Sequence, residues 1–157
     1  MKIKGIIDED FVNYKKPCMV IEFPYCSMKC DVECGRPICQ NSQLALAPMV
    51  DIPIPAIVKR YLDNDISQAI VFQGMEPFDS WTDLHNLINE FRNYTVDDII
   101  IYTGYNKNEI EDKLKHLKLY YNIIVKFGRF IPDEKSRYDT LLGVTLASPN
   151  QYSERIS

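Results

Sequence analysis

Short apolar runs alternate along the chain with segments in which apolar positions recur at helical spacing. The runs are rich in β-branched residues and are bounded by turn-forming residues, a pattern typical of buried strands. They predict strands at 18–23, 69–73, 98–102 and 121–126.

The segments between the runs predict helices. The first covers 55–62 and starts with a proline, which is well suited to a first helical turn. Ser80 and Asp83 have the spacing of a capping box. The apolar positions that follow at helical period are Leu84, Leu87, Ile88 and Phe91. Asn106 is expected to cap a further helix over 107–117.

Buried strands alternating with amphipathic helices indicate β-α-β units. We expect one α/β domain over 1–157, built as a partial (β/α) barrel or an open, mostly parallel sheet. The part after Gly128 is less regular and is expected to wrap the sheet edge. Ligands collect at the carboxyl ends of parallel strands. The loops at 24–42, 73–77 and 102–105 should therefore meet at one rim.

Four of the five cysteines lie in the first of these loops. They are Cys26, Cys30, Cys34 and Cys39, whereas Cys18 falls in a predicted strand and is expected to be buried. Five cysteines in 157 residues do not suggest a disulfide scaffold, and the clustering indicates a bound metal. Structural zinc with four thiolates and an iron–sulfur cluster are both open, although zinc sites more often contain two-residue gaps between cysteines.

The net charge and the lack of long apolar segments indicate which kinds of partner the protein does not bind. The formal net charge is −4, which disfavours nucleic-acid binding. No apolar stretch is long enough for a membrane span, and the first ten residues become acidic too soon for a signal peptide. We therefore expect a cytoplasmic protein that binds neither nucleic acid nor membrane.

Several motifs, in this order, resemble radical S-adenosylmethionine enzymes, above all the small activating enzymes of anaerobic ribonucleotide reductase. The cysteine pair resembles the start of the CxxxCxxC motif, and the turn after the second strand resembles Gly-Gly-Glu-Pro. The motifs are Cys26-Ser-Met-Lys-Cys30, Cys39-Gln-Asn-Ser42, Gln73-Gly-Met-Glu-Pro-Phe78, Tyr102-Thr-Gly-Tyr105, Val125-Lys-Phe-Gly-Arg-Phe130 and Ser148-Pro-Asn-Gln151.

The chain departs from that pattern at three places, one of which is the absence of the usual aromatic residue next to the third cysteine, where Ile38 and Gln40 stand. Position 33, where the third cysteine is usual, is Glu, and Met75 replaces the second glycine of the turn. The third cluster ligand is therefore either Cys34 or Cys39. The residues flanking Cys39 favour Cys39, which leaves Cys34 as a spare thiol, an exchangeable ligand or a fourth ligand.

The resemblance implies a 4Fe–4S cluster held by three thiolates, with one iron free to bind S-adenosylmethionine. It implies that Gly74, Met75, Glu76 and Pro77, with Thr103, contact that cofactor. The implied activity is generation of a glycyl radical on the large subunit of anaerobic ribonucleotide reductase. The electron would come from a low-potential donor such as flavodoxin.

Two other functions fit the same residues. One is activation of a different glycyl-radical enzyme by the same chemistry. The other is a non-enzymatic adaptor that binds a metal through four cysteines, in which case Cys34 is a required ligand.

Overall fold

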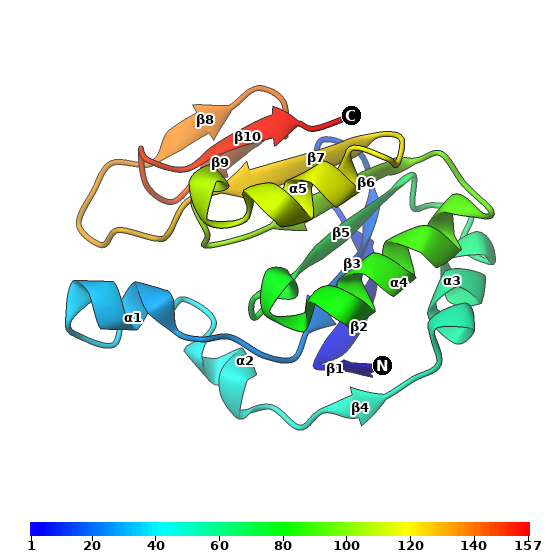
Figure 1. The fold of residues 1–157 in the computed structure, drawn as a ribbon, viewed down its shortest axis with the longest axis horizontal. Coiled ribbons are helices and arrows are strands. Elements are labelled where there is room, and N and C mark those ends of the chain that lie inside the picture. Colours follow the sequence, from blue (N-terminus) through cyan, green and yellow to red (C-terminus); the bar gives the residue numbers. More distant parts are fainter.

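A six-stranded sheet forms the centre of the computed structural model, which describes residues 1–157 (Figure 1). Its spatial order is β10-β7-β6-β5-β3-β2. The strands are β2 (Gly5–Asp10), β3 (Cys18–Phe23), β5 (Ala69–Gly74), β6 (Asp98–Tyr102), β7 (Ile123–Phe127) and β10 (Tyr152–Arg155).

The inner strands β3, β5, β6 and β7 are parallel, and the two edge strands β2 and β10 are antiparallel to their neighbours. This confirms the predicted α/β fold with a mostly parallel sheet. Each inner strand lies beside the preceding inner strand in the chain. The loops that follow these strands therefore leave from one edge of the sheet.

Three helices cover one face of the sheet (Figure 1). They are α3 (Ile54–Leu62), α4 (Trp81–Arg92) and α5 (Glu111–Leu117). Side chains alternate along each strand, so that Met19, Ile21 and Phe23 join the core on this face while Cys18 and Val20 point to the other. The larger of the two apolar cores lies between the sheet and the helices.

The second face carries a smaller core, closed by Tyr14, Leu142 and Leu146. Leu146 belongs to a hairpin of β8 (Arg137–Asp139) and β9 (Val144–Leu146). The buried Asp139 accepts hydrogen bonds from the backbone and side chain of Ser153, which attaches the hairpin to β10. The region after Gly128 thus lies along the sheet edge, as expected, and it also supplies the edge strand β10, which was not predicted.

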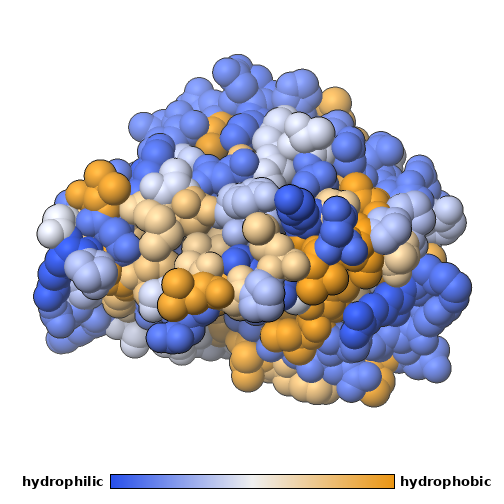
Figure 2. Space-filling view, turned by 90° about the horizontal axis from the view of Figure 1, so that it is seen from below, coloured by the Kyte–Doolittle hydropathy of each residue, from blue (hydrophilic) through white to orange (hydrophobic).

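The cysteine loop forms the short helices α1 (Lys29–Cys34) and α2 (Ser42–Leu46), neither of which has a buried residue. It continues into β4 (Val50–Asp51), which pairs with β1 (Lys2–Ile3). These elements lie at the lower side of Figure 1, and Figure 2 views that side. Apolar patches interrupt its polar surface. None of the helices has the length and hydropathy that a bilayer span requires.

The structure corrects three local expectations. The helix predicted over 107–117 is interrupted at Ile110, and a 3-10 helix, Lys107–Glu109, precedes α5. Strand β7 begins at Ile123 because Asn122 has a φ of 55°, outside the range of a strand. Ser80 makes no side-chain capping bond, since a 3-10 helix, Pro77–Ser80, precedes α4.

Candidate metal centre

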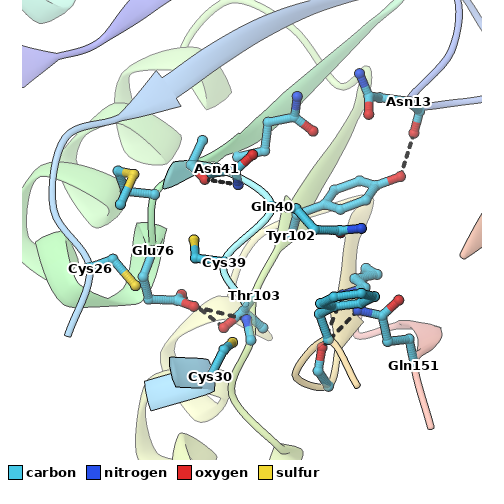
Figure 3. A pocket seen from close by; sticks show the side chains of 17 residues that line it. Asn13, Cys26, Cys30, Cys39, Gln40, Asn41, Glu76, Tyr102, Thr103 and Gln151 are labelled. Atoms are coloured by element: carbon cyan, nitrogen blue, oxygen red, sulfur yellow. Dashed lines mark hydrogen bonds between the residues drawn. The ribbon is translucent and has the colours of Figure 1, made fainter. Parts of the chain in front are cut away.

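A cavity of about 310 Å³ opens at the carboxyl edge of the sheet (Figure 3). The strand register brings its walls together, since Phe23 lies beside Gly74 and Tyr102 beside Lys126. The three loops that the sequence places at one rim all contribute, and the segment after β7 adds a fourth side that was not predicted. The lining residues are Asn13, Cys26, Cys30, Cys39, Gln40, Asn41, Gln73, Gly74, Met75, Glu76, Tyr102, Thr103, Gly104, Lys126, Gly128, Phe130 and Gln151.

Three of the four clustered cysteines line this cavity. Cys26, Cys30 and Cys39 lie around the side chain of Glu76 (Figure 3). Cys34 is exposed and lies outside, on the wall of a neighbouring cavity that also includes Cys30. The structure therefore brings Cys39, and not Cys34, to the same cavity as the first two cysteines.

Side-chain hydrogen bonds fix the path of the loop between these cysteines. Asp31 of α1 accepts hydrogen bonds from the backbone of Ile38 and Cys39 at 2.8 and 2.9 Å. Asn41 donates to the carbonyl of Gly74 at the end of β5. The loop thus turns back after α1, and its carboxyl end is attached to the sheet beside Glu76.

The thiols are partly shielded from water. Burial raises the pKa of the Cys26 thiol to about 11, and the backbone N–H of Met28 opposes this by donating to its Sγ at 3.2 Å. Burial also raises the pKa of Cys30, which the N–H of Phe130 and the charge of Arg129 oppose. Backbone N–H groups close to two sulfurs are a favourable environment for thiolate ligands.

Glu76 is the most heavily hydrogen-bonded acid of the site and is only 5% exposed. Its carboxylate accepts from Thr103 Oγ1 at 2.8 Å, Gly104 N at 2.9 Å and Phe78 N at 3.1 Å. Burial raises its pKa to about 7 although these three donors favour the ionised form. Glu76 therefore closes the turn after β5 and caps the 3-10 helix Pro77–Ser80.

The other residues of the predicted cofactor site divide into two groups. Gly74 and Met75 line the cavity. Pro77 is absent from the lining and lies in the 3-10 turn that follows. Thr103 is buried and bonded to Glu76, so its hydroxyl supports that carboxylate. Gly74 alone in this turn has a positive φ, of 93°, so Met75 does not require the conformation of the glycine it replaces.

On the opposite wall of the cavity lie parts of the 125–130 and 148–151 motifs, but the sequence interpretation gave no role to Lys126. Lys126 is 7% exposed and donates to the carbonyl of Gly128 at 3.0 Å. Gln151 donates to the same carbonyl, and Tyr102 donates to the backbone of Asn13. Burial lowers the pKa of Lys126 to about 8. The sequence did contain one signal for Lys126, because a charged residue stands there near the carboxyl end of an apolar strand.

Residues 18–148 match the profile of a family described as the 4Fe-4S single cluster domain. The chain belongs to this family. The match covers the cysteine loop and all four parallel strands. Neither the curated proteins nor the solved structures contain a match to the chain.

The donor set of this iron–sulfur domain fits its cluster. A mononuclear thiolate zinc site holds its sulfurs about 4 Å apart, given Zn–S bonds of about 2.3 Å. No group of three or more His, Cys, Asp or Glu side chains is arranged to hold a single metal ion. Three cysteines around one cavity supply the thiolate ligands that an iron–sulfur cluster uses.

Proposed function

We propose that this protein is a radical S-adenosylmethionine enzyme that generates a glycyl radical on anaerobic ribonucleotide reductase. The observation that carries the proposal is the number of thiols on the cavity. Cys26, Cys30 and Cys39 line it and Cys34 does not. Three thiolates on a four-iron cluster leave one iron without a protein ligand, as a reactive site requires.

In this proposal Cys26, Cys30 and Cys39 hold the cluster, and the residues after β5 bind the cofactor. The carboxylate of Glu76 faces the same cavity and is suited to accept the ammonium of S-adenosylmethionine. A cation beside Glu76 favours the ionised form of this buried acid. Thr103 and the backbone of Gly104 keep the carboxylate oriented. When bound, the cluster supplies the electron that cleaves the cofactor.

The opening of the site supports a protein substrate. The main cavity adjoins a second one of about 230 Å³, and five residues line both: Asn13, Gln40, Tyr102, Lys126 and Gln151. Val12, at the wall of the second cavity, is 73% exposed. Phe11, the residue before it, is 65% exposed, and neighbouring apolar side chains left open beside a site suit a surface that a protein partner covers. A low-potential donor such as flavodoxin would reduce the cluster.

A four-cysteine adaptor has less support. It requires Cys34 to join the other three thiols at one metal, whereas Cys34 is exposed and borders a different cavity. Activation of another glycyl-radical enzyme would use the same residues of this chain. The two activities differ only in which partner enzyme receives the radical.

The test is to mix the reduced, reconstituted protein anaerobically with S-adenosylmethionine and the large subunit of anaerobic ribonucleotide reductase. We expect 5′-deoxyadenosine and methionine to form, and an electron paramagnetic resonance signal of a glycyl radical to appear on the reductase. Cys34→Ser is the matched control and should retain both results, while Cys39→Ser should lose them. Cofactor cleavage without a reductase radical would point to another glycyl-radical partner, and no cleavage would exclude the proposal.

A further inference from the structure

Helix α1 carries Cys30, yet it has no apolar anchor. It is six residues long, none of them buried, and its N-cap Met28 makes no side-chain capping bond. A helix this short is not stable by itself in water. Its position on the rim, and that of the Cys30 thiol, must therefore come from contacts other than apolar packing.

Charged side chains supply these contacts. Arg129, which follows β7, donates to Glu109 through two nitrogens at 2.6 and 2.7 Å. Its Nε lies 3.1 Å from the carboxylate of Glu33, which is on α1. That nitrogen has no hydrogen-bond partner, so the contact with Glu33 is an ion pair. One guanidinium thus joins α1 to the segment before α5.

A second residue of α1 faces the same group. Lys29 lies 3.3 Å from the carboxylate of Glu109 and 4.4 Å from the ring centre of Tyr105. Lys29 and Glu33 are four positions apart and therefore lie on one side of the helix. Both salt bridges of α1 to the segments that follow β6 and β7 thus meet at the Arg129–Glu109 pair.

Arg129 is also close to the thiol itself. It is only 6% exposed and, with Cys30, lines two further cavities next to the main one. The following residue, Phe130, shares the main cavity with Cys30. A buried guanidinium is weakly screened by water, so its charge acts on a nearby sulfur more strongly than a surface lysine would.

We propose that Arg129 is the positioning residue for Cys30: it holds α1 on the rim through Glu33 and Glu109 and places a positive charge beside this ligand. The inference rests on the assignment of Cys30 as a cluster ligand in the proposed function. It needs neither S-adenosylmethionine nor the reductase. Arg suits the role because a planar guanidinium can contact two carboxylates at once, which a lysine ammonium does less well.

The first measurement is hydrogen–deuterium exchange of the full chain without iron. In Arg129→Gln we expect residues 29–34 to exchange about tenfold faster than in the wild type, and in Glu33→Gln, whose side chain is 59% exposed, about two- to threefold faster. The central strands should be unchanged. Glu33→Gln keeps the Arg129–Glu109 pair, so it tests the same link if Arg129→Gln does not fold. The control is Lys107→Gln, which removes an exposed cation paired with Glu154.

The second measurement is the reduction potential of the reconstituted cluster. Arg129→Gln should make the potential more negative than in the wild type. A neighbouring cation stabilises the reduced cluster more than the oxidised one, because the reduced cluster carries more negative charge. Arg129→Lys should restore most of the difference, and Lys107→Gln should not change the potential.

Two results would overturn the proposal. One is wild-type exchange of 29–34 in both Arg129→Gln and Glu33→Gln. The other is a reduction potential in Arg129→Gln equal to that of Lys107→Gln, which would reduce Arg129 to a structural residue. Both readouts are independent of radical formation. A failure of the reductase assay therefore does not overturn this inference. Likewise, a negative result in the exchange or potential measurements does not overturn the proposed function.

Discussion

At the scale of single residues, the carboxylate of Glu76 connects the loops after two neighbouring strands. It accepts from Phe78 in its own loop and from Thr103 and Gly104 in the loop after β6. A buried carboxylate is stable in the ionised form only with such donors. The geometry of the cavity wall therefore depends on a few hydrogen bonds more than on apolar packing.

The hydroxyl of Thr103 is one of these donors. Thr103→Val keeps the side-chain shape and removes the bond, so it should lower the free energy of unfolding by about 1–2 kcal/mol. The measurement is urea denaturation. Thr103→Ser, which keeps the hydroxyl, should lie closer to the wild type, and equal losses in the two variants would contradict the role of the hydrogen bond.

The backbone of Gly74 is constrained twice. Its φ is 93°, and a Cβ there would lie 2.9 Å from the Cα of Glu22. Gly74→Ala should therefore lower the free energy of unfolding by at least about 2 kcal/mol. Gly35→Ala is a control with positive φ, 69°, but no atom within 4 Å. It should cost about 1 kcal/mol, and an equal loss in both variants would argue against the steric contact.

At the scale of elements, hydrophobic patterning was sufficient to predict the four parallel strands of the sheet. Strands 18–23 and 98–102 have the predicted bounds, because apolar runs buried on both faces have few alternative structures. The antiparallel edge strands β2 and β10 were missed. β2 contains three acidic residues and β10 contains Ser, Glu and Arg, so neither shows a buried apolar run.

A charged cluster holds the start of β6. Asp98 accepts hydrogen bonds from Tyr14, Lys16 and Arg155. Burial opposes ionisation of Asp98, but these donors outweigh it and keep its pKa below the ordinary value of 3.8. A carboxyl whose pKa is lower in the folded state contributes stability above its unfolded pKa and loses it as the pH falls through the folded pKa.

We therefore expect the free energy of unfolding to fall as the pH decreases below about 4, with a smaller slope in Asp98→Asn. Urea denaturation over a series of pH values measures the slope in the wild type and in Asp98→Asn. Asp112→Asn removes an exposed carboxylate paired with Lys115 and should keep the wild-type slope. The same slope in Asp98→Asn and the wild type would show that Asp98 does not carry this dependence.

At the scale of the whole molecule, the site combines parts that are far apart in the sequence. The rim position of the loops followed from the parallel sheet, and so did the meeting of Cys26 with Glu76. The choice between Cys34 and Cys39 did not follow, because spacing alone does not determine the path of a loop. The bonds from Ile38 and Cys39 to Asp31 determine that path.

Lys126 and Arg129 were missed for a related reason. Their importance comes from burial beside the cysteine loop, and burial of a charged residue is visible only once the fold is known. The strand pattern placed Lys126 at a strand end, but its contact with Gly128 and its place on the wall of the same cavity as Glu76 depend on the folded chain.

Removal of iron should destabilise the whole protein. A group that binds only the folded state stabilises that state, so chelation of the reconstituted protein should lower Tm by at least about 5 °C. Differential scanning calorimetry with and without chelator measures the change. Cys39→Ser should show no such difference, and a Tm unaffected by chelation in the wild type would contradict the coupling of cluster binding to folding.

The most direct test of the central claim is the iron and sulfide content after anaerobic reconstitution of the wild type, Cys34→Ser and Cys39→Ser. A cluster held by Cys26, Cys30 and Cys39 predicts about four irons and four sulfides per chain in the wild type and in Cys34→Ser. It predicts loss of both in Cys39→Ser. A full cluster in Cys39→Ser together with its loss in Cys34→Ser would contradict the three-thiol site.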